Sequence, residues 1–242
     1  MPRTATELRT FDLCSSDYDA YLNQALAATG EEKEYYARGR IRWLATCLAQ
    51  LGKKPASVLD FGCGIGSSSP FLLADLGSKS VTGVDTSAKA IECARKEFQD
   101  ERIQFSLAQD LLPGVAFDCA YCNGVFHHVA PGEWPAALAF VKRALRPGGL
   151  FAFWENNPWN PGTRYVMCRC EFDKDAVKIS PHRARRMLKE AGFVLLRTDF
   201  LFFFPRALSV MRPLESALRK IPLGGQYQIL CRKPLLPDQP TT

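Results

Sequence analysis

Apolar and polar residues alternate in blocks between positions 58 and 154, and the blocks have the lengths of strands and helices. Short, nearly continuous apolar runs are typical of strands that are buried on both faces of a sheet. Five runs of this kind predict strands at 58–61, 81–84, 103–107, 117–122 and 150–154. The segments between them predict helices at about 67–76, 88–98 and 133–145. Such strand–helix alternation predicts a parallel sheet with helices on both faces.

The flanking segments predict further helices and strands. Residues 18–51 have the pattern of two helices broken near Gly30. Ser180 is expected to cap a basic helix that runs to Glu190, because serine side chains accept hydrogen bonds from first-turn N–H groups. The rest of the chain has a strongly apolar run over 194–204 that Pro205 breaks, a predicted helix over 206–220 interrupted at Pro213, and a predicted strand over 226–230.

The first predicted strand leads directly into a glycine cluster. Asp60 lies near the end of the apolar run, and Gly62, Gly64 and Gly66 follow it. A glycine turn between a strand and a helix brings backbone N–H groups close to a ligand, because glycine has no side chain and tolerates positive φ. A dinucleotide-binding loop would have its third small residue at position 67, and no Gly-Lys-Ser/Thr sequence of an ATPase loop is present.

An acidic residue, Asp85, ends the second predicted strand, about twenty residues after the glycine turn. An acid at this place can accept hydrogen bonds from both hydroxyls of a ribose. The alternative is a role at the N-terminus of the following helix, as a cap. The glycine loop that precedes it favours ribose binding.

Five segments, in order and spacing, make the chain resemble the class I S-adenosylmethionine-dependent methyltransferases: 58–66, 83–87, 109–111, 117–129 and 145–154. The resemblance covers about residues 35–192. It implies an α/β, Rossmann-like, seven-stranded sheet that is mostly parallel, with an antiparallel last strand and helices on both faces. It further implies an N-terminal helical lid (1–52), a methyltransferase domain (53–242) with a basic and aromatic insertion at about 156–222, and a terminal strand pair at 194–201 and 226–232.

The resemblance also implies that the cofactor is S-adenosylmethionine, and it assigns residues to each part of it. Contacts to the methionine portion are implied for Asp60, Gly62, Cys63, Gly64, Gly66, Asn123 and Gly124. Contacts to the adenosine are implied for Asp85 at the ribose and for Thr86, Asp110 and Leu111 at the adenine. Arg38 or Arg40, in a stretch that resembles a lid helix, is a candidate for the cofactor carboxylate, and a surface role is the alternative.

The candidates for catalysis and for the acceptor site follow the fourth and fifth strands. His127 and His128 have the residue type that takes a proton from an acceptor near neutral pH, and a structural role is the alternative. The segment after the fifth strand lies on the ligand side of such a sheet, and its acceptor candidates are Glu155, Asn156, Trp159 and Arg164. The aromatic run at 200–206 predicts a buried strand or, alternatively, a wall of an apolar acceptor site. The anion-binding candidates are Arg164, Arg169, Arg206 and Arg212.

The nine cysteines predict packing and no metal site. Cys119 and Cys122 have the spacing of a redox or zinc pair, but residues three apart on a strand point to opposite faces. Cys168 and Cys170 are too close together to complete such a site. No apolar run approaches the roughly 20 residues of a membrane span, and no secretion signal begins the chain. We therefore expect a cytoplasmic protein without a membrane span, either a monomer or a homodimer.

Three functions are compatible with these patterns. The leading one is methyl transfer to an oxygen or nitrogen atom of a small molecule, such as a biosynthetic, sugar-like or lipid-like acceptor. The second is an RNA or protein methyltransferase, because the net charge is +6 and the basic excess lies late in the chain. Against nucleic acid, there is no recognisable binding module and no basic–aromatic interleaving. The third is a non-catalytic S-adenosylmethionine-binding protein, or a different nucleotide enzyme of similar fold.

Overall fold

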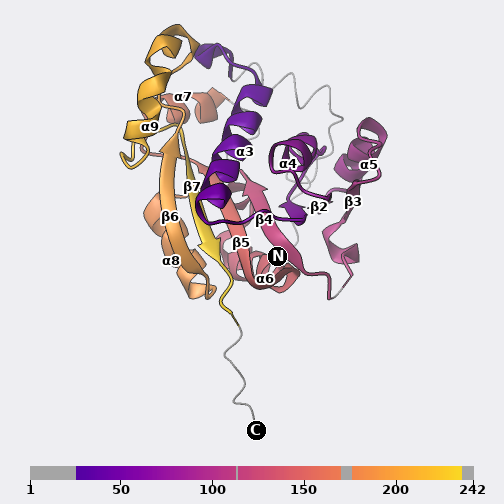
Figure 1. The fold of residues 1–242 in the computed structure, drawn as a ribbon. Coiled ribbons are helices and arrows are strands. Elements are labelled where there is room, and N and C mark those ends of the chain that lie inside the picture. Colours follow the sequence, from indigo (N-terminus) through magenta and orange to yellow (C-terminus); the bar gives the residue numbers. More distant parts are fainter. Residues whose placement is uncertain (1–25, 113, 170–175, 236–242) are drawn as a thin grey trace.

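The computed structural model describes residues 26–112, 114–169 and 176–235 (Figure 1). The strands of this part are β1 Ser57–Phe61, β2 Ser80–Asp85, β3 Ile103–Leu107, β4 Phe117–Asn123, β5 Leu145–Asn156, β6 Val194–Leu201 and β7 Gln226–Arg232. Its α-helices are α3 Lys33–Gln50, α4 Ser69–Asp75, α5 Ala88–Glu97, α6 Trp134–Ala144, α7 Pro161–Arg169, α8 Pro181–Glu190 and α9 Glu215–Leu218. Its 3₁₀ helices are η1 Ala27–Thr29, η2 Ala108–Asp110, η3 Phe126–His128, η4 Pro131–Glu133 and η6 Arg206–Leu214.

The strands form one sheet with the order β3-β2-β1-β4-β5-β7-β6. β7 is antiparallel to both of its neighbours, β5 and β6, whereas the other pairings are parallel. This confirms the predicted seven-stranded, mostly parallel sheet with an antiparallel last strand. The chain reverses its winding direction between β1 and β4, and the carboxyl ends of these two strands border the crevice where sheets of this type bind ligands.

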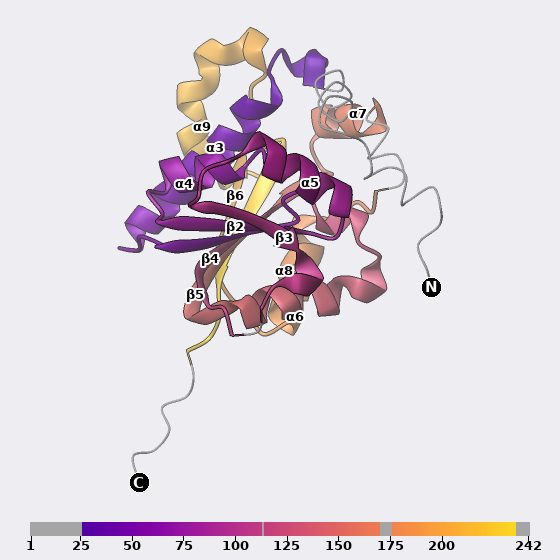
Figure 2. The same ribbon diagram turned by 90° about the vertical axis from the view of Figure 1, so that its right-hand side faces the viewer.

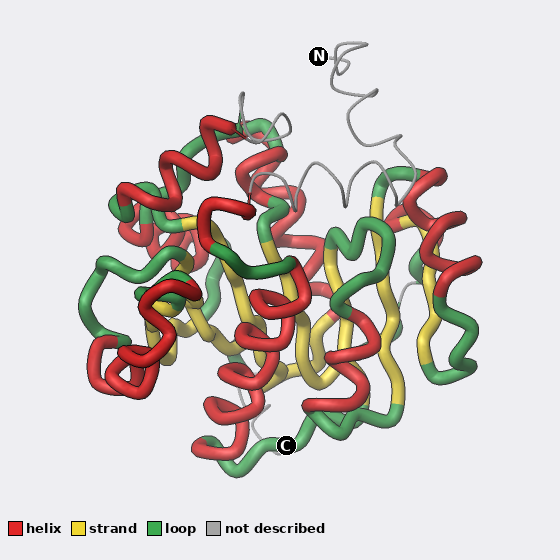
Figure 3. The backbone as a smooth tube through the Cα atoms, turned by 90° about the horizontal axis from the view of Figure 1, so that it is seen from above, coloured by secondary structure: helices red, strands yellow, loops and turns green. Residues whose placement is uncertain are grey.

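Helices cover both faces of the sheet, as the apolar strands predicted (Figures 2 and 3). On one face, α3, α4 and α5 bury side chains such as Leu44, Leu72 and Ile91 against the strands. On the opposite face, α6 and α8 contribute Leu138 and Leu188 to a second core. Strand residues alternate between the two cores, which explains why almost every position in the central strands is apolar.

Several boundaries differ from the predictions for local reasons. β5 begins at Leu145, five residues early, because Leu145 already pairs with Phe117 before the turn at Gly148, whose φ is +76°. β6 ends at Leu201, as the terminal strand pair implied by the resemblance has it, and the apolar run that continues to residue 204 leaves the sheet because Phe202 adopts a left-handed φ of +63°. The segment after Pro205 forms two short helices, η6 and α9, and the first helix expected within 18–51 lies mostly outside the described residues.

Two smaller predictions concern the helix at 180–190 and membrane spans. The hydroxyl of Ser180 accepts a hydrogen bond from the N–H of Arg183, so the predicted cap of α8 is confirmed. In the part of the chain that the structure describes, no helix combines the length and the apolar character needed to span a bilayer.

Candidate functional site

A cavity of about 500 Å³ lies at the carboxyl ends of β1, β2 and β4, and we call it the glycine cleft. The loop after β1 forms its floor, while side chains of α3, α4 and α6 form its walls. It contains eight of the residues predicted to contact a cofactor: Asp60, Gly62, Cys63, Gly64, Asp85, Thr86, Asn123 and Gly124. The order of the sheet therefore brings together residues that lie far apart in the sequence.

The glycine loop is held against the end of β2. The N–H groups of Gly62 and Cys63 both donate to the carbonyl of Val84, at 2.8 and 3.1 Å. At Gly62 (φ +70°) a Cβ atom would lie 2.3 Å from a methyl group of Val125, so the close approach requires glycine. At Gly64 (φ +54°) a Cβ would meet no protein atom within 4 Å, because this position borders the open cleft.

Asp85 is anchored by two backbone amides and still borders the cleft. Its Oδ2 accepts from the N–H of Gly64 and its Oδ1 from the N–H of Ser87, both at 2.9 Å. The cap of α5 is Ser87, whose hydroxyl accepts from the N–H of Ala90. Asp85 is therefore not the helix cap that was its alternative role, and each carboxylate oxygen retains a further lone pair.

Asp60 presents a second carboxyl group to the cleft. It is almost fully buried, and its Oδ2 accepts from the hydroxyl of Ser69 at 2.8 Å. Burial raises the pKa of Asp60 to about 7, with a further upward contribution from the Asp85 charge, while Ser69 and Arg40 act in the opposite direction. A cation bound beside Asp60 would favour its ionised form.

Three predicted cofactor residues do not border the glycine cleft. Gly66 packs against Phe105, whose ring would lie 2.7 Å from a Cβ at this position, so Gly66 serves the packing of the loop. Asp110 is exposed at the end of η2, and Leu111 is partly buried against one of the two cores. Their proposed contacts to the adenine remain predictions.

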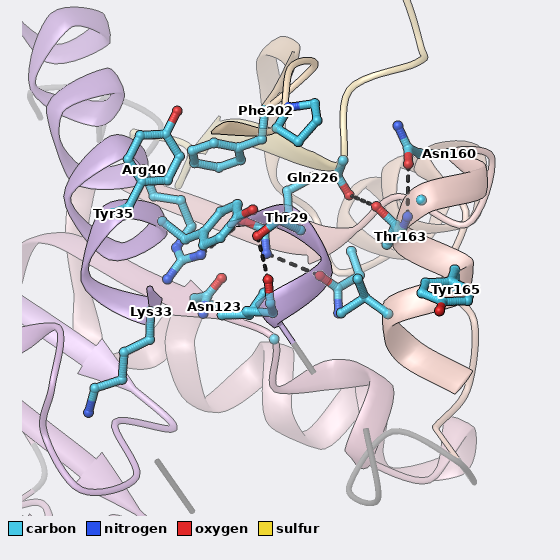
Figure 4. Close-up of a pocket in the computed structure, with 18 of the residues that line it drawn as sticks. Thr29, Lys33, Tyr35, Arg40, Asn123, Asn160, Thr163, Tyr165, Phe202 and Gln226 are labelled. Carbon is cyan, nitrogen blue, oxygen red and sulfur yellow. Dashed lines mark hydrogen bonds between the residues drawn. The ribbon is translucent and has the colours of Figure 1, made fainter. Parts of the chain in front are cut away.

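A second cavity, of about 530 Å³, adjoins the glycine cleft, and we call it the aromatic chamber (Figure 4). Its walls include Tyr35, Tyr36 and the run from Phe202 to Phe204. The rings of Tyr36 and Phe202 meet edge to face with centroids 4.9 Å apart. The two cavities share the residues Lys33, Arg40, Asn123, Gly124 and His128. The aromatic run at 200–206 thus both ends a buried strand and lines a cavity.

Arg40 is one of the two arginines that the sequence offered for the cofactor carboxylate without deciding between them. It is buried, and it donates from Nε to the Tyr121 hydroxyl at 3.0 Å and from Nη1 to Gln226 at 2.9 Å. Gln226 in turn donates to the Asn156 side chain at 3.1 Å. Arg38, the other candidate, is exposed and lies over the Phe71 ring. Of the two arginines, Arg40 alone borders both cavities.

A buried histidine–carboxylate pair lies at the end of β4 and β5. His127 Nδ1 is 2.5 Å from Glu155 Oε2, and both side chains are at most 5% exposed. Glu155 Oε1 accepts from the N–H groups of Phe126 and His127, at 3.0 and 3.3 Å. A carboxylate facing Nδ1 holds the proton on that nitrogen and leaves Nε2 as the hydrogen-bond acceptor of a neutral ring. His127 lines the aromatic chamber, and His128 lines both cavities.

The four predicted acceptor residues have different surroundings. Asn156 lines the aromatic chamber, whereas Glu155 points to the opposite face of β5 and contacts His127. Trp159 is exposed beside the His182 ring, and Arg164 is exposed on α7, so neither borders the chamber. Asn160 and Thr163, which the sequence did not single out, do line it, because their side chains donate to the backbone carbonyls of Leu223 and Gly225.

The four anion-binding candidates and the pair Cys119 and Cys122 make contacts within the protein and line neither cavity. Arg212 pairs with Glu31 at 2.7 Å, and Arg206 contacts Gly30. None of the four candidate arginines lines the chamber in the described part of the chain. Cys119 and Cys122 pack into opposite cores. Among the described residues, no group of three or more potential metal ligands comes together.

Comparison with known proteins agrees with this arrangement. Residues 58–149 match the family model of a methyltransferase domain. The solved S-adenosylmethionine-dependent methyltransferase from Mesorhizobium loti has the same fold, with a TM-score of 0.54 at 23% identity, over 74% of this chain and 91% of that one. Residues 58–149 are therefore similar in sequence to methyltransferase domains, and the described chain has the fold of a solved S-adenosylmethionine-dependent methyltransferase.

Two curated relatives align with part of this chain. Trans-aconitate 2-methyltransferase from Rhodopseudomonas palustris (strain BisB18) is 35% identical over 101 residues, 40% of this chain and 38% of the relative. Malonyl-[acyl-carrier protein] O-methyltransferase from Pseudescherichia vulneris is 36% identical over 111 residues, 44% of this chain and 41% of the relative. The chain thus spans less than half the length of these relatives.

Proposed function

We propose that this protein transfers a methyl group from S-adenosylmethionine to an oxygen atom of a small molecule held in the aromatic chamber. The observation that carries the proposal is the wall common to the two cavities, formed in part by Asn123, Gly124 and His128. A methyl donor in the glycine cleft and an acceptor in the chamber would meet at this wall. An in-line displacement needs this kind of positioning.

The residues of the glycine cleft fit an adenosyl amino acid. Each Asp85 oxygen has a lone pair left for one ribose hydroxyl, because each accepts only one backbone N–H. Asp60 offers a carboxylate to a cationic amino group, and Arg40 offers a guanidinium at the border of the cleft to a carboxylate. The open space at Gly64 leaves room for the ligand beside the backbone.

Within this proposal, the bound cofactor supplies an activated methyl group. The protein positions the methyl acceptor and removes its proton. His127 takes the proton of an acceptor hydroxyl on Nε2, while Glu155 stabilises the imidazolium that forms. The aromatic walls exclude water from the reacting atoms. These roles need the proton of a neutral His127 to lie on Nδ1, and the Glu155 contact favours this tautomer over the other.

The lining of the chamber favours an oxygen acceptor over a cationic amine. The described residues that line it include Lys33 and Arg40 but no aspartate or glutamate. A protonated amine would therefore enter beside positive charges without a carboxylate to pair with. Four amide side chains (Asn123, Asn156, Asn160 and Gln226) can instead hydrogen-bond hydroxyl or carboxylate oxygens. The names of the two aligned relatives, a trans-aconitate 2-methyltransferase and a malonyl-[acyl-carrier protein] O-methyltransferase, also support an oxygen acceptor.

The proposal is tested in two steps. Calorimetry with S-adenosylhomocysteine and, in parallel, with NAD tests the cleft, and binding of the first alone is expected. Transfer of labelled methyl groups into metabolite extracts, followed by base treatment and mass spectrometry, then identifies the acceptor and the atom that carries the methyl. NAD binding without a response to S-adenosylhomocysteine would overturn the cofactor assignment, and label found only on nitrogen would overturn the oxygen acceptor.

The raised pKa of Asp60 predicts opposite effects of pH on ligand binding and on stability. Because Asp60 has a pKa of about 7 in the free protein, affinity for the cationic amino acid portion should fall about tenfold per pH unit below 7. Since the folded pKa lies above the unfolded one, Asp60 favours folding only while protonated, and its contribution declines as pH rises from about 4 to 7. Asp60→Asn should therefore raise the Tm of the free protein at pH 8 and abolish the pH dependence of binding. Calorimetry and thermal melts at pH 5–8 measure both, and an unchanged pH profile in the variant would contradict the assignment.

A further inference from the structure

The outer face of η6 carries apolar side chains that the fold leaves exposed. No residue of this 3₁₀ helix is buried. Residues three apart lie in one row on a 3₁₀ helix. Leu208 lies at a kink, where φ and ψ are not helical, and in the turns after it Met211 and Leu214 form one row while Val210 belongs to the next. All four are exposed, Val210 to 86% and Leu214 to 54%.

The side chains of η6 that contact the rest of the protein include two arginines. Arg212 donates to Glu31 at 2.7 Å, and its guanidinium lies 4.5 Å from the centroid of the Tyr35 ring. The Cβ of Arg206 lies against Gly30, 2.9 Å from where a Cβ would be. Surface helices normally bury an apolar stripe and expose their charges. In η6 this arrangement is reversed, so its exposed apolar side chains are not needed for attachment to the fold.

The exposed apolar side chains continue past α9. We call the set formed by Leu208, Val210, Met211, Leu214, Ile221 and Leu223 the apolar rim. It contains six of the 13 large hydrophobic residues that are exposed in the described parts of the chain. Single exposed hydrophobic residues are ordinary, whereas a concentration of this kind marks an interaction surface. Figures 1 and 2 show the segment at the outer edge of the molecule, beside the start of α3.

The charge around the rim indicates the kind of partner. Residues 206–223 include Arg206, Arg212, Arg219 and Lys220 and one acid, Glu215, which accepts hydrogen bonds from the N–H groups of Phe203 and Phe204. Arg212 pairs with Glu31, and Lys220 shares Asp199 with Arg197. When these paired groups are included, five cations and three acids give the region a net positive charge. A second copy of the chain would bring two positive rims together, which like-charge repulsion opposes. A bilayer with anionic headgroups complements both the charge and the apolar side chains.

We propose that the apolar rim docks onto an anionic bilayer surface. The rim follows directly after the segment from Phe202 to Pro205, which lines the aromatic chamber. Docking would therefore hold the chamber beside the bilayer, where an amphiphilic acceptor would be available. Peripheral binding of this kind needs no membrane-spanning segment. It does not depend on the methyl-transfer proposal, because it concerns a different surface.

The test is sedimentation of the full chain with vesicles of phosphatidylcholine alone and of phosphatidylcholine mixed with phosphatidylglycerol. Binding is expected to the mixed vesicles and is expected to weaken as salt is added. The double variant Val210→Glu, Leu214→Glu should bind at least about tenfold more weakly, because both side chains would leave the apolar phase. Leu51→Glu is the matched control, since Leu51 is 43% exposed and follows the other end of α3.

Three results would overturn the membrane proposal. The first is a wild-type chain that does not sediment with the mixed vesicles. The second is equal binding by the double variant and the wild type. The third is a wild-type dimer in light scattering together with a monomeric double variant, because a second copy would then occupy the rim. Equal affinity of wild type and double variant for S-adenosylhomocysteine verifies that the variant is folded, whatever the methyl acceptor is.

Discussion

Glu155→Gln is expected to lower turnover by about 10²- to 10⁴-fold while leaving affinity for the cofactor product unchanged. The glutamine Oε1 can still accept from the N–H groups of Phe126 and His127, so the fold around it is preserved. Its NH₂ group, however, would face His127 Nδ1, where the Glu155 Oε2 lies at 2.5 Å. Because an amide NH₂ only donates, Nδ1 would become the acceptor and Nε2 would carry the proton. The ring would then have a protonated Nε2, so it could not take a proton from the methyl acceptor.

His127→Asn should cause a similar loss of turnover, and the double variant should lose little more than either single variant, because the two residues act as one unit. His128→Asn is the matched control, since His128 also lines the chamber. The measurements are kcat and KM over a range of pH, with calorimetry on S-adenosylhomocysteine as a test of folding. A residue that only maintains structure would not remove the dependence of kcat on the ionisation of a base. Turnover by Glu155→Gln within a few-fold of wild type would exclude His127 as the base.

Most of the fold could be predicted because its signals are local. Apolar runs of strand length, glycines at turns and the Ser180 cap depend on neighbouring residues, and the terminal pair at 194–201 and 226–232 matches β6 and β7. The glycine cleft could also be anticipated, because carboxyl ends of parallel strands meet at one edge. The predicted start of β5 was wrong, since it depends on the pairing of Leu145 with Phe117.

The acceptor side was harder to predict because it depends on the direction of side chains. The alternation of side chains along β5 does predict which residues face the acceptor side. Phe151, Phe153 and Glu155 share one face of β5, whereas Asn156 shares the other with Trp154. The alternation of residues along the strand therefore suffices to place Glu155 and Asn156 on opposite faces. Trp159 and Arg164 gave no comparable signal, since the turn after β5 sets their direction.

Arg40, on helix α3, also has a role that depends on contacts the sequence does not reveal. It lies four residues before Leu44 and next to Ile41, within the buried stripe of α3. An arginine in an apolar stripe is unusual unless it is paired. The sequence does not reveal its partners, because Tyr121 and Gln226 are 81 and 186 residues away along the chain. Long-range pairing of this kind decides which arginine reaches the cleft.

A large loss of cofactor affinity is expected when Asp85 is replaced. Asp85→Asn should weaken binding of S-adenosylmethionine and S-adenosylhomocysteine by about 10²- to 10³-fold, because hydrogen bonds to a charged acceptor contribute about 1.5–3 kcal/mol each. We expect the ribose to use both carboxylate oxygens. Asparagine supplies only one oxygen, and its NH₂ group would face the N–H of either Gly64 or Ser87. The substitution would thus remove a ribose contact and also disturb the end of the glycine loop.

The matched control for Asp85→Asn is Asp100→Asn, because Asp100 lies away from the cleft and pairs with its near neighbour Arg102. Calorimetry with adenosine, methionine and S-adenosylhomocysteine separates the two halves of the ligand. Loss of adenosine affinity with methionine affinity retained would assign Asp85 to the ribose. Equal loss for both halves would instead indicate collapse of the glycine loop, since Gly64 and Asp85 are directly bonded. Undiminished affinity for S-adenosylhomocysteine would contradict the role of Asp85 and the cofactor geometry that depends on it.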